Sequence, residues 1–447
     1  MTAPASVIEA SLESLFEEHL RIQRARTDAA LEACGFEALA IYAGRPPLKF
    51  LDDQPYPFVV NPHFNLWTPQ PDAHDCWIVY RAGSRPQLIF LQPVDYWHKP
   101  PALPAGYWTR QFDIAVIRRA EEARTYLDPL ERCACIGEGL QEAAQWGFAA
   151  INPPQLLERL HYSRAIKTAY EVECMRRASI LAARGHVAAE AAFRAGASEY
   201  QILLDFVRAT QHTENELPYS SIVALNGNAA VLHYQHQERQ PPAQLHSFLI
   251  DAGAAFGGYA ADVTRTYSAR SDDFAALVDG MHSLQLSLCS QVRKGVDYAQ
   301  IHLDAHRQIA ELLRTSGLIN VAADDAVASG LSAVFFPHGV GHLLGLQVHD
   351  VSGFTVNIDG ATKARPPGHP NLRLTRTLEP GFAVTIEPGL YFIDALLNEA
   401  RNSVHAASID WRRVDQFRPC GGIRIEDNVV CTESEPLNLT RAAFASV

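Results

Sequence analysis

The sequence has little of what marks a secreted or membrane-spanning protein. Only eight of its 447 residues are cysteine, and no two of them form a CxxC pair. A disulfide-stabilised fold is therefore excluded, and we expect reduced thiols. No apolar run approaches the length of about 18 residues that a membrane helix needs. The N-terminal segment lacks the basic and apolar regions of a signal peptide, so we expect a cytoplasmic protein.

Basic residues are also in deficit, since 38 Lys and Arg stand against 50 Asp and Glu, a net charge of −12. An acidic chain of this kind is a poor general binder of nucleic acid and of anionic membranes, and we expect neither as a partner. Hydrophobic residues at 47% and charged residues at 20% are ordinary for a globular protein and exclude long disordered stretches. The acidic excess is still compatible with local cation sites.

The first third of the chain has the pattern of an α/β domain. Apolar residues recur at helical spacing between residues 7 and 33, which predicts an amphipathic helix. Short apolar runs bounded by proline and glycine clusters then predict strands at 38–42, 77–80 and 88–91. The aromatic stretch 93–107 is either a packed loop or a loop that shields a neighbouring site.

The remainder has the pattern of a large α+β domain, after a boundary near residues 162–167. Residues 168–171 and 198–201 have the Thr/Ser-x-x-Glu/Gln spacing of a capping box, each at the start of a helix. Ser271 and Asp297 are the expected caps of two more helices. Strand-like segments rich in histidine, glycine and glutamate follow, and we expect one large domain.

Asp251 and Asp262 flank a glycine turn between two apolar runs, which predicts a β-hairpin. In one register the two aspartates lie directly opposite each other. With the turn shifted by one residue they lie diagonally, still on the same face. Carboxylates side by side repel unless a cation lies between them. A solvated face is the alternative, which the flanking apolar residues disfavour.

Three histidines, His338, His342 and His349, fall in one glycine-rich stretch. Histidine is the commonest metal ligand and acid–base group, and glycine lets the backbone approach a site closely. The stretch lacks the third glycine of a dinucleotide-binding loop, and the HExxH motif of one class of zinc protease occurs nowhere in the sequence. We therefore expect a functional site here.

Two acidic segments complete the set, although each is weak evidence alone. Glu387 ends an apolar strand at a Pro-Gly turn, and Glu426 shares one face of a predicted strand with Arg424. With the two aspartates they supply four carboxylates beside one or more imidazoles. Such a set suits two divalent cations about 3.5–4 Å apart that hold a bridging hydroxide. Carboxylate-rich ligation favours manganese or a similar ion.

The motifs and their order resemble those of the pita-bread metallopeptidases, and within them the bacterial Xaa-Pro dipeptidases (prolidases) with their organophosphorus acid anhydrolase branch. The shared motifs are DAG at Asp251, ADVTRT at Asp262, PHGVGHLLGLQVHD, TIEPGLYF and GGIRIED. Weaker similarity runs through residues 217–236 and through two N-terminal segments, so that the resemblance covers most of the chain.

The resemblance implies a fold and an activity. Residues 1–163 would form a creatinase-like α/β domain, a mixed sheet with flanking helices. Residues 164–447 would form an α+β pita-bread catalytic domain. The implied activity is hydrolysis of Xaa-Pro dipeptides by two metal ions per subunit. Relatives are homodimers, and in such a dimer Trp97 and its loop would line the partner's site.

By the same resemblance, five side chains would hold the metal pair: Asp251, Asp262, His342, Glu387 and Glu426. Asp262 and Glu426 would bridge both ions. Arg424 would orient a bridging carboxylate. Glu387 would also carry the proton to the leaving prolyl nitrogen, since a carboxylate near the metals can serve as general acid.

A second group would face the substrate. His233 and His349 would contact the scissile carbonyl or the collapsing intermediate, although His233 has a purely structural alternative. His338 would lie beside the site, with the same alternative, and Tyr219 would form part of the pocket wall. Arg376 would meet the dipeptide carboxylate. Arg373 lies close in sequence and is chemically able to do the same.

Other functions are open at this point. Aminopeptidase P would share the ligands but accept longer Xaa-Pro peptides. Phosphotriester hydrolysis is a plausible side activity, because the same hydroxide can attack phosphorus. A catalytically inactive peptide-binding module or a metal-free amidohydrolase such as creatinase is disfavoured, because competent residues occupy all five ligand positions.

Overall fold

The structure, a computed structural model of the chain, describes residues 5–213 and 215–447. They form two compact units. The first comprises the described residues up to Cys174 together with Asn357–Ala361, and the second comprises Met175–Val356 and Thr362–Val447. The division between them falls within helix α5 (Ala169–Arg194). The domain boundary between residues 163 and 164 stays a prediction.

The first unit is built on a mixed six-stranded sheet with the strand order β4-β3-β2-β1-β5-β6. Neighbours β1 and β2 are antiparallel, whereas β1 and β5 are parallel. The strands are β1 (Ala38–Tyr42), β2 (Trp77–Arg81), β3 (Gln87–Leu91), β4 (Asp113–Ile117), β5 (Cys133–Ile136) and β6 (Ala150–Ile151). The helices are α1 (Ala5–Cys34), α2 (Pro62–Asn65), α3 (Arg124–Leu127) and α4 (Pro154–Arg164).

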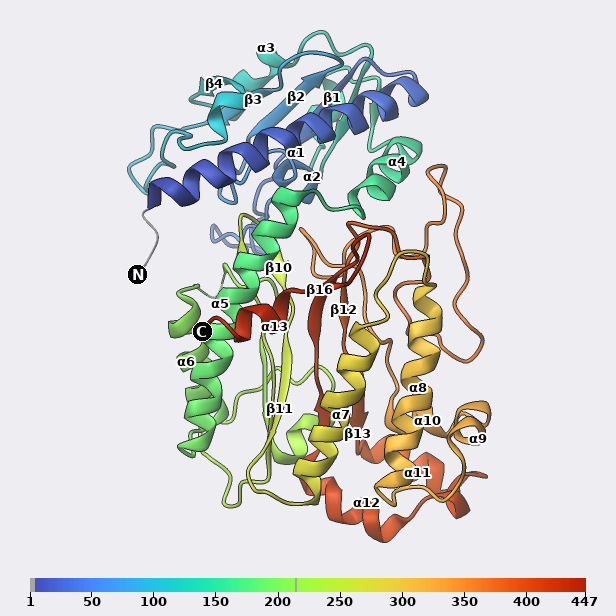
Figure 1. The fold of residues 1–447 in the computed structure, drawn as a ribbon. Helices are drawn as coiled ribbons and strands as arrows, with labels where there is room; N and C mark the ends of the chain where they lie inside the picture. Colours follow the sequence, from blue (N-terminus) through green and yellow to red (C-terminus); the bar gives the residue numbers. More distant parts are fainter. Residues whose placement is uncertain (1–4, 214) are drawn as a thin grey trace. The chain divides into compact units, whose positions relative to one another are not determined.

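Helix α1 runs across the sheet of this unit (Figure 1). Its side chains Phe16 and Leu20 are buried, as are the strand residues Ile78 and Phe90. The expected α/β domain is thus confirmed, as are its amphipathic helix and its three predicted strands. The stretch 93–107 contains no helix or strand. Trp97 is 76% exposed within this unit, whereas Tyr107 packs edge-on against Phe16, so the stretch is packed at its end and open at Trp97.

The second unit combines helices with several short strands. Its helices are most of α5, then α6 (Glu199–Thr210), α7 (Asp273–Cys289), α8 (Tyr298–Thr315), α9 (Ala323–Ala328), α10 (Leu331–Phe335), α11 (Asp394–Arg401), α12 (Trp411–Phe417) and α13 (Leu439–Phe444). Its strands are β7 (Ile222–Leu225), β8 (Ser247–Asp251), β9 (Ala254–Phe256), β10 (Tyr259–Ala261), β11 (Thr264–Ser268), β12 (Ala383–Ile386), β13 (Gly389–Tyr391), β14 (Gly422–Arg424), β15 (Asp427–Val430) and β16 (Leu437–Asn438).

Two three-stranded sheets, β11-β8-β7 and β12-β15-β16, form the centre of this unit. A bridge between Thr264 and Glu426 joins a strand of the first sheet to the segment before a strand of the second. Helices α5 and α6 pack on the first sheet, where Phe193, Phe206 and Phe248 share a buried apolar cluster. Helices α7 and α8 lie on the other side of the sheets in Figure 1. The α+β prediction is confirmed.

The hairpin that carries the two aspartates adopts the diagonal register. Phe256 pairs with Tyr259 across a turn of Gly257 and Gly258, both with positive φ. Such a two-glycine turn fits the right-handed twist of a hairpin. Asp251 therefore pairs with Thr264 rather than with Asp262. The second of the two registers considered above is the observed one.

Helix caps largely follow the sequence. Thr168 and Glu171 exchange backbone–side-chain hydrogen bonds at the start of α5, and Ser198 and Gln201 do so at α6. Asp297 caps α8 as expected. The predicted cap at Ser271 is wrong by one residue, because the Asp272 carboxylate accepts hydrogen bonds from two amides at the start of α7. No described helix is long and apolar enough to cross a membrane.

Glu199, at the first position of α6, anchors the segment that follows β7. Its carboxylate accepts hydrogen bonds from the amides of Leu225 and Glu238, from the Asn228 side chain and from the Tyr234 hydroxyl, at 2.8–2.9 Å. The side chain is fully buried. One carboxylate thus fixes both ends of the stretch that contains His233.

We expect Glu199→Ala to destabilise the protein by about 3 kcal/mol, because four donors lose their acceptor in a buried place. Amide hydrogen exchange at Leu225 and Glu238 should become much faster, and the urea midpoint should fall. Glu238→Gln is the matched control, since that side chain is exposed. Unchanged exchange at both amides in Glu199→Ala would show that other contacts hold the segment.

Candidate metal centre

The acidic residues singled out in the sequence converge in the second unit, each at the end of a strand. Asp251 ends β8, Asp262 follows β10 and Glu387 follows β12. Glu426 lies between β14 and β15. Strand ends fix the backbone while leaving the next side chain free to point out of the sheet. The two sheets therefore deliver four carboxylates to one place.

Two glycines permit the close packing around these residues. A Cβ atom on Gly253 would lie 2.2 Å from the Ala261 carbonyl oxygen and 2.7 Å from the Tyr219 ring. A Cβ atom on Gly341 would lie 2.2 Å from the Thr385 carbonyl oxygen, and its φ of +152° disfavours any other residue. The glycines of DAG and of the histidine-rich stretch thus let adjacent ligand residues approach the site.

The ligand atoms of Asp262, His342 and Glu426 all lie within 4.8 Å of one another. His342 Nε2 lies 3.4 Å from Asp262 Oδ2 and 3.6 Å from Glu387 Oε1. Asp251 lies beside them: one of its oxygens accepts a hydrogen bond from Arg424, and the other is buried without a partner. The structure thus brings all five predicted ligands into one cluster.

The electrostatics of this cluster are those of a site built for a cation. Burial and then the neighbouring carboxylates raise the pKa of Glu426 well above its usual value. Burial raises the pKa of Glu387 to about 7, and it raises the pKa of Asp251 as well. Burial also opposes ionisation of Asp262, but the hydrogen bond and charge of His342, together with Tyr219 and His349, outweigh this and lower its pKa.

The four carboxylates carry a formal charge of −4, and Arg424 brings one permanent positive charge among them. Because like charges held together in a dry place are costly, the donor set and the buried, unpartnered oxygen of Asp251 fit divalent cations well. His342 has the tautomer that metal binding requires, since its Nδ1 faces the Leu343 carbonyl oxygen at 2.9 Å and leaves Nε2 directed at the carboxylates.

Arg424 and Tyr391 tie the ligands to their surroundings. The guanidinium of Arg424 donates hydrogen bonds to Asp251, to the Thr264 hydroxyl and to the Tyr391 hydroxyl. The same Tyr391 hydroxyl lies 2.8 Å from Nε2 of His338. Nδ1 of His338 lies 3.8 Å from Oε2 of Glu387, and burial lowers the pKa of His338 to about 3. Neutral His338 therefore lies at the edge of the carboxylate cluster.

The remaining predicted residues occupy the surroundings of the cluster. The His349 ring packs edge-on against His342 with centroids 4.4 Å apart, and burial lowers its pKa to about 4. Burial, then Asp251 and Asp262, raise the pKa of Tyr219 well above its usual value, which places its hydroxyl near both carboxylates. His233 is exposed, and its charge acts on both His338 and His349.

The two candidate arginines lie in different settings. Arg376 is 2% exposed, donates hydrogen bonds to Ser352 and Glu379, and stacks on the Phe382 ring. Arg373 is exposed, and its charge lowers the pKa of His349 after the effects of burial and His342. The buried arginine is held in place, whereas the exposed one is near enough to a predicted catalytic histidine for its charge to lower the pKa of that histidine.

Residues 173–433 match the sequence profile of metallopeptidase family M24. Residues 14–162 match the profile described as the N-terminal domain of Xaa-Pro dipeptidase. The chain belongs to metallopeptidase family M24, within the group of the Xaa-Pro dipeptidases. The expected family is therefore confirmed, and its ligand set requires a divalent metal cofactor.

Individual relatives agree along the whole chain. An Xaa-Pro dipeptidase of Xanthomonas axonopodis pv. citri is 51% identical over 98% of this chain and 99% of its own length. One of Stenotrophomonas maltophilia is 50% identical over 97% of this chain and 98% of its own. A structure of aminopeptidase P from E. coli with the inhibitor Pro-Leu superposes with a TM-score of 0.71 at 22% identity, covering 96% of this chain and 98% of that one. At that identity the likeness shows the fold, and the two-domain pita-bread prediction is confirmed.

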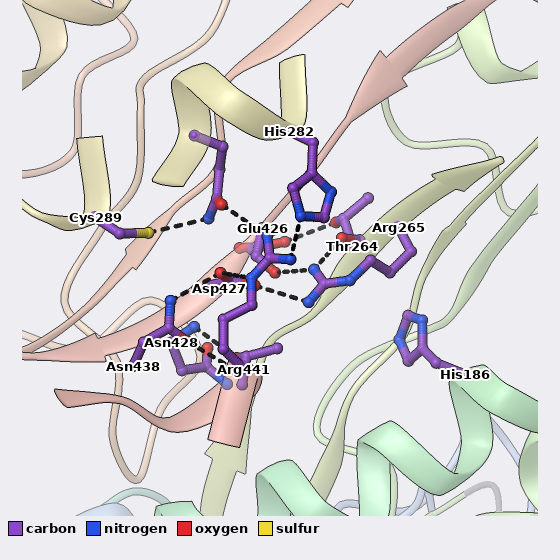
Figure 2. Close-up of polar contacts among 12 residues, drawn as sticks. His186, Thr264, Arg265, His282, Cys289, Glu426, Asp427, Asn428, Asn438 and Arg441 are labelled. Atoms are coloured by element: carbon purple, nitrogen blue, oxygen red, sulfur yellow. Dashed lines mark hydrogen bonds and ion pairs between the residues drawn. The ribbon is translucent and has the colours of Figure 1, made fainter. Parts of the chain in front are cut away.

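Behind the carboxylates of this M24 centre lies a buried polar network that the sequence interpretation missed. Arg265 and Arg441 both point to Asp427, one to each carboxylate oxygen (Figure 2). Burial opposes ionisation of Asp427, but the two arginines outweigh it and lower its pKa to about 2. Asp427 directly follows Glu426, so this ion cluster fixes the backbone of a predicted metal ligand.

The same network reaches two ligands at once. Arg265 also donates to the Glu426 carbonyl oxygen, and the Thr264 hydroxyl donates to the Glu426 carboxylate at 2.7 Å. On the other side, Arg441 donates to Gln285, whose amide donates to the carbonyl oxygen of Ile386, the residue before Glu387. Asp427, Thr264 and Arg265 stand inside the quoted motifs and could have been suspected, whereas Arg441 and Gln285 carry no sequence signal.

We expect Asp427→Asn to weaken metal binding by about 10- to 100-fold, as loss of an outer partner of a metal ligand does. The measurement is a chelator-competition titration of the folded protein. Arg441→Lys keeps the positive charge beside Asp427, so it should weaken metal binding less than Asp427→Asn does. Glu433→Gln is the control, because that carboxylate makes an exposed ion pair with Lys294. An unchanged metal affinity in folded Asp427→Asn would contradict a positioning role for this network.

Proposed function

We propose that this chain hydrolyses Xaa-Pro dipeptides with a metal centre formed by Asp251, Asp262, His342, Glu387 and Glu426. The observation that carries the proposal is the buried convergence of four carboxylates on one histidine, in a chain about half identical to Xaa-Pro dipeptidases along its whole length. Aminopeptidase P shares the fold at 22% identity, which is too distant to favour its preference for longer peptides.

Two manganese ions per subunit fit the donor set best. Four carboxylates and one imidazole balance two divalent charges, and carboxylate oxygen suits manganese better than it suits softer ions. Asp262 and Glu426 are the proposed bridging ligands, since their ligand atoms lie within 4.8 Å of each other and of His342. When bound, the ions would polarise the scissile carbonyl and lower the pKa of the attacking water toward neutrality.

The protein's own side chains would do the rest. Glu387 would carry the proton to the leaving prolyl nitrogen, a transfer for which a carboxyl with a raised pKa is suited. His349 and His233 would donate hydrogen bonds to the oxyanion that forms at the carbonyl. Arg424 would orient Asp251 through its 2.7 Å hydrogen bond, and its charge opposes the effect of burial on the pKa of Asp251. It thus acts on a carboxylate other than the two bridging ones for which this role was expected. Tyr219 and neutral His338 would form the wall beside the substrate.

The C-terminal carboxylate of the dipeptide needs a cation. We retain Arg376 for this role for two reasons. It donates a hydrogen bond to Ser352, which follows His349 by three residues, and its stacking on the Phe382 ring holds it rigid. Arg373 is the second candidate, since it is exposed and acts on His349 directly. A bidentate arginine would make a dipeptide's free carboxylate part of the recognition.

We also propose a cytoplasmic homodimer. All eight cysteines are unpaired, as in proteins of reducing compartments. The first unit exposes several large apolar side chains on two loops, among them Phe50, Leu51, Tyr96 and Trp97, each at least 76% exposed. Exposed apolar loops of this kind usually mark a protein–protein contact. The mass in solution tests the proposal, since a dimer has twice 49.3 kDa.

The metal mechanism predicts that Asp262→Asn lowers kcat/KM for Ala-Pro by about a thousandfold or more, because the isosteric amide cannot hold a divalent pair. Exhaustive chelation should abolish activity, and added manganese should restore it in the wild type but not in the variant. Asp279→Asn, an exposed aspartate on α7, is the control. Full activity in Asp262→Asn, or after chelation, would exclude the mechanism.

The carboxylate-binding arginine should reveal itself in KM. Replacement of the arginine that binds the substrate carboxylate should raise KM for Ala-Pro by about 10- to 100-fold, because a hydrogen bond to a charged group is lost. The change in kcat should be smaller. Arg376→Ala and Arg373→Ala are compared at matched pH, with thermal midpoints measured in parallel to separate unfolding of the Arg376 surroundings. If neither substitution raises KM, recognition of the free carboxylate by these arginines is wrong.

A further inference from the structure

Away from the carboxylate cluster, three histidines converge on one point. His302 and His306 lie one turn apart on α8, and His369 comes from the turn after Gly368. One nitrogen from each lies within 4.8 Å of the other two. His302 Nε2 and His369 Nδ1 are 3.0 Å apart. Around a tetrahedral zinc ion with bonds of 2.0–2.1 Å, such nitrogens would be about 3.3 Å apart. The His302–His369 pair would open slightly, and the His306 nitrogen would draw closer from its present position within 4.8 Å.

The rings are oriented as ligands of a common ion would be. His302 and His306 stand at 89° with centroids 4.7 Å apart, and His306 and His369 stand at 65° with centroids 4.6 Å apart. The Nδ1 atom of His306 lies 3.0 Å from the Ser332 hydroxyl, which leaves its Nε2 for a ligand. A partner on the far nitrogen is the usual way in which proteins fix a metal-binding imidazole.

The cluster is held out of water. His302 is 1% exposed, and its Nε2, the nitrogen directed at the other two rings, lies in a hydrogen bond with Nδ1 of His369 that a metal ion would replace, while its Nδ1 on the far side is buried without a partner. Burial lowers the pKa of His302 to about 2 and that of His306 to about 3, so both imidazoles are neutral. The neutral imidazole is the form that binds metal ions.

A small cavity of about 30 Å³ lies at the cluster, lined by the three histidines with Phe336, Asn371 and other residues. This is enough for one ion with a water molecule. None of the described residues that line it is acidic. His369 is half-buried, so an ion could enter from solvent, and three protein ligands would leave one coordination position open.

We propose that His302, His306 and His369 form a second metal site, specific for a divalent ion that prefers imidazole, and for zinc in the first instance. The site shares no ligand with the carboxylate centre, and its chemistry is opposite: nitrogen donors alone here, mostly carboxylate oxygen there. Imidazole sites favour zinc, nickel and copper, whereas carboxylate sites favour manganese and magnesium. The two sites would thus sort two kinds of metal.

An ion at the three histidines would also be linked to the catalytic surroundings. The Phe336 ring packs between His306 and His338, with centroids 4.8 Å from each. The Asn371 side chain donates a hydrogen bond to the Pro337 carbonyl oxygen, next to His338. Metal binding would therefore tie the turn around His369 to α8 and stiffen the segment that begins the histidine-rich stretch.

The test is the zinc content of the purified protein after dialysis against buffered zinc. Wild type should hold one zinc ion per chain more than His369→Ala and His306→Ala, and His405→Ala, a partly buried histidine elsewhere in this unit, should match wild type. The X-ray absorption of wild type minus that of His369→Ala should show the pattern of imidazole rings, with about three nitrogen neighbours and at most one oxygen neighbour from water. His369 is half-buried, so this variant is expected to keep its helix content.

The readout does not require catalysis, and it separates the two sites because the carboxylate centre remains intact in every variant. Equal zinc in wild type and in both folded histidine variants would overturn the proposal. A difference spectrum without the imidazole pattern and with mainly oxygen neighbours would overturn it equally, since the extra ion would then lie at a carboxylate site.

Discussion

The structure of the second unit is dominated by the cost of holding four carboxylates together out of water. Asp251, Asp262, Glu387 and Glu426 come from two sheets, and one guanidinium lies among them. Without further positive charge their ionised forms repel one another, which is why burial raises the pKa of three of the four. Divalent cations bound among the carboxylates remove this cost. The proposed pair of hard ions would owe its affinity to the same negative field.

Everything around the cluster serves to keep that arrangement rigid. The diagonal hairpin register places Thr264 opposite Asp251, and from there its hydroxyl reaches Glu426. Glycines at 253 and 341 let neighbouring backbones approach to distances that a side chain would forbid. Behind them, Asp427 is paired with two arginines and anchors the chain next to Glu426. Ligands held in this way need little reorganisation when metal enters, which favours both affinity and catalysis.

Much of this could be predicted, because the relevant signals are local. The hairpin follows from two apolar runs around a glycine pair. Strand alternation predicts that Arg424 and Glu426, two residues apart, lie on the same face. The hairpin's register stayed open, because it depends on which two residues form the turn. The cap of α7 was misplaced by one residue for a similar reason: Ser271 and Asp272 are both good caps, and backbone geometry decides between them.

Contacts between segments far apart in the sequence could not be predicted. Glu199 holds the His233 segment, and Arg441 supports Asp427, yet neither position differs locally from an ordinary surface charge. The three histidines of the second metal site come from two distant segments. His369 lies 63 residues after His306 on α8, so only the fold brings them together. Arg373 and Arg376 illustrate a further limit of sequence-based prediction. Both are candidates for binding the substrate carboxylate, and only the structure shows that Arg376 is buried whereas Arg373 is exposed.

The central claim is that this metal centre acts on a proline-containing dipeptide with a free carboxylate. The most direct measurement compares kcat/KM for Ala-Pro and for Ala-Pro-Ala with the manganese-loaded protein at the same pH. The account predicts rapid cleavage of Ala-Pro and little cleavage of the tripeptide, because a third residue removes the carboxylate that an arginine must meet. Equal or faster cleavage of Ala-Pro-Ala would contradict it and would assign the chain an aminopeptidase P activity instead.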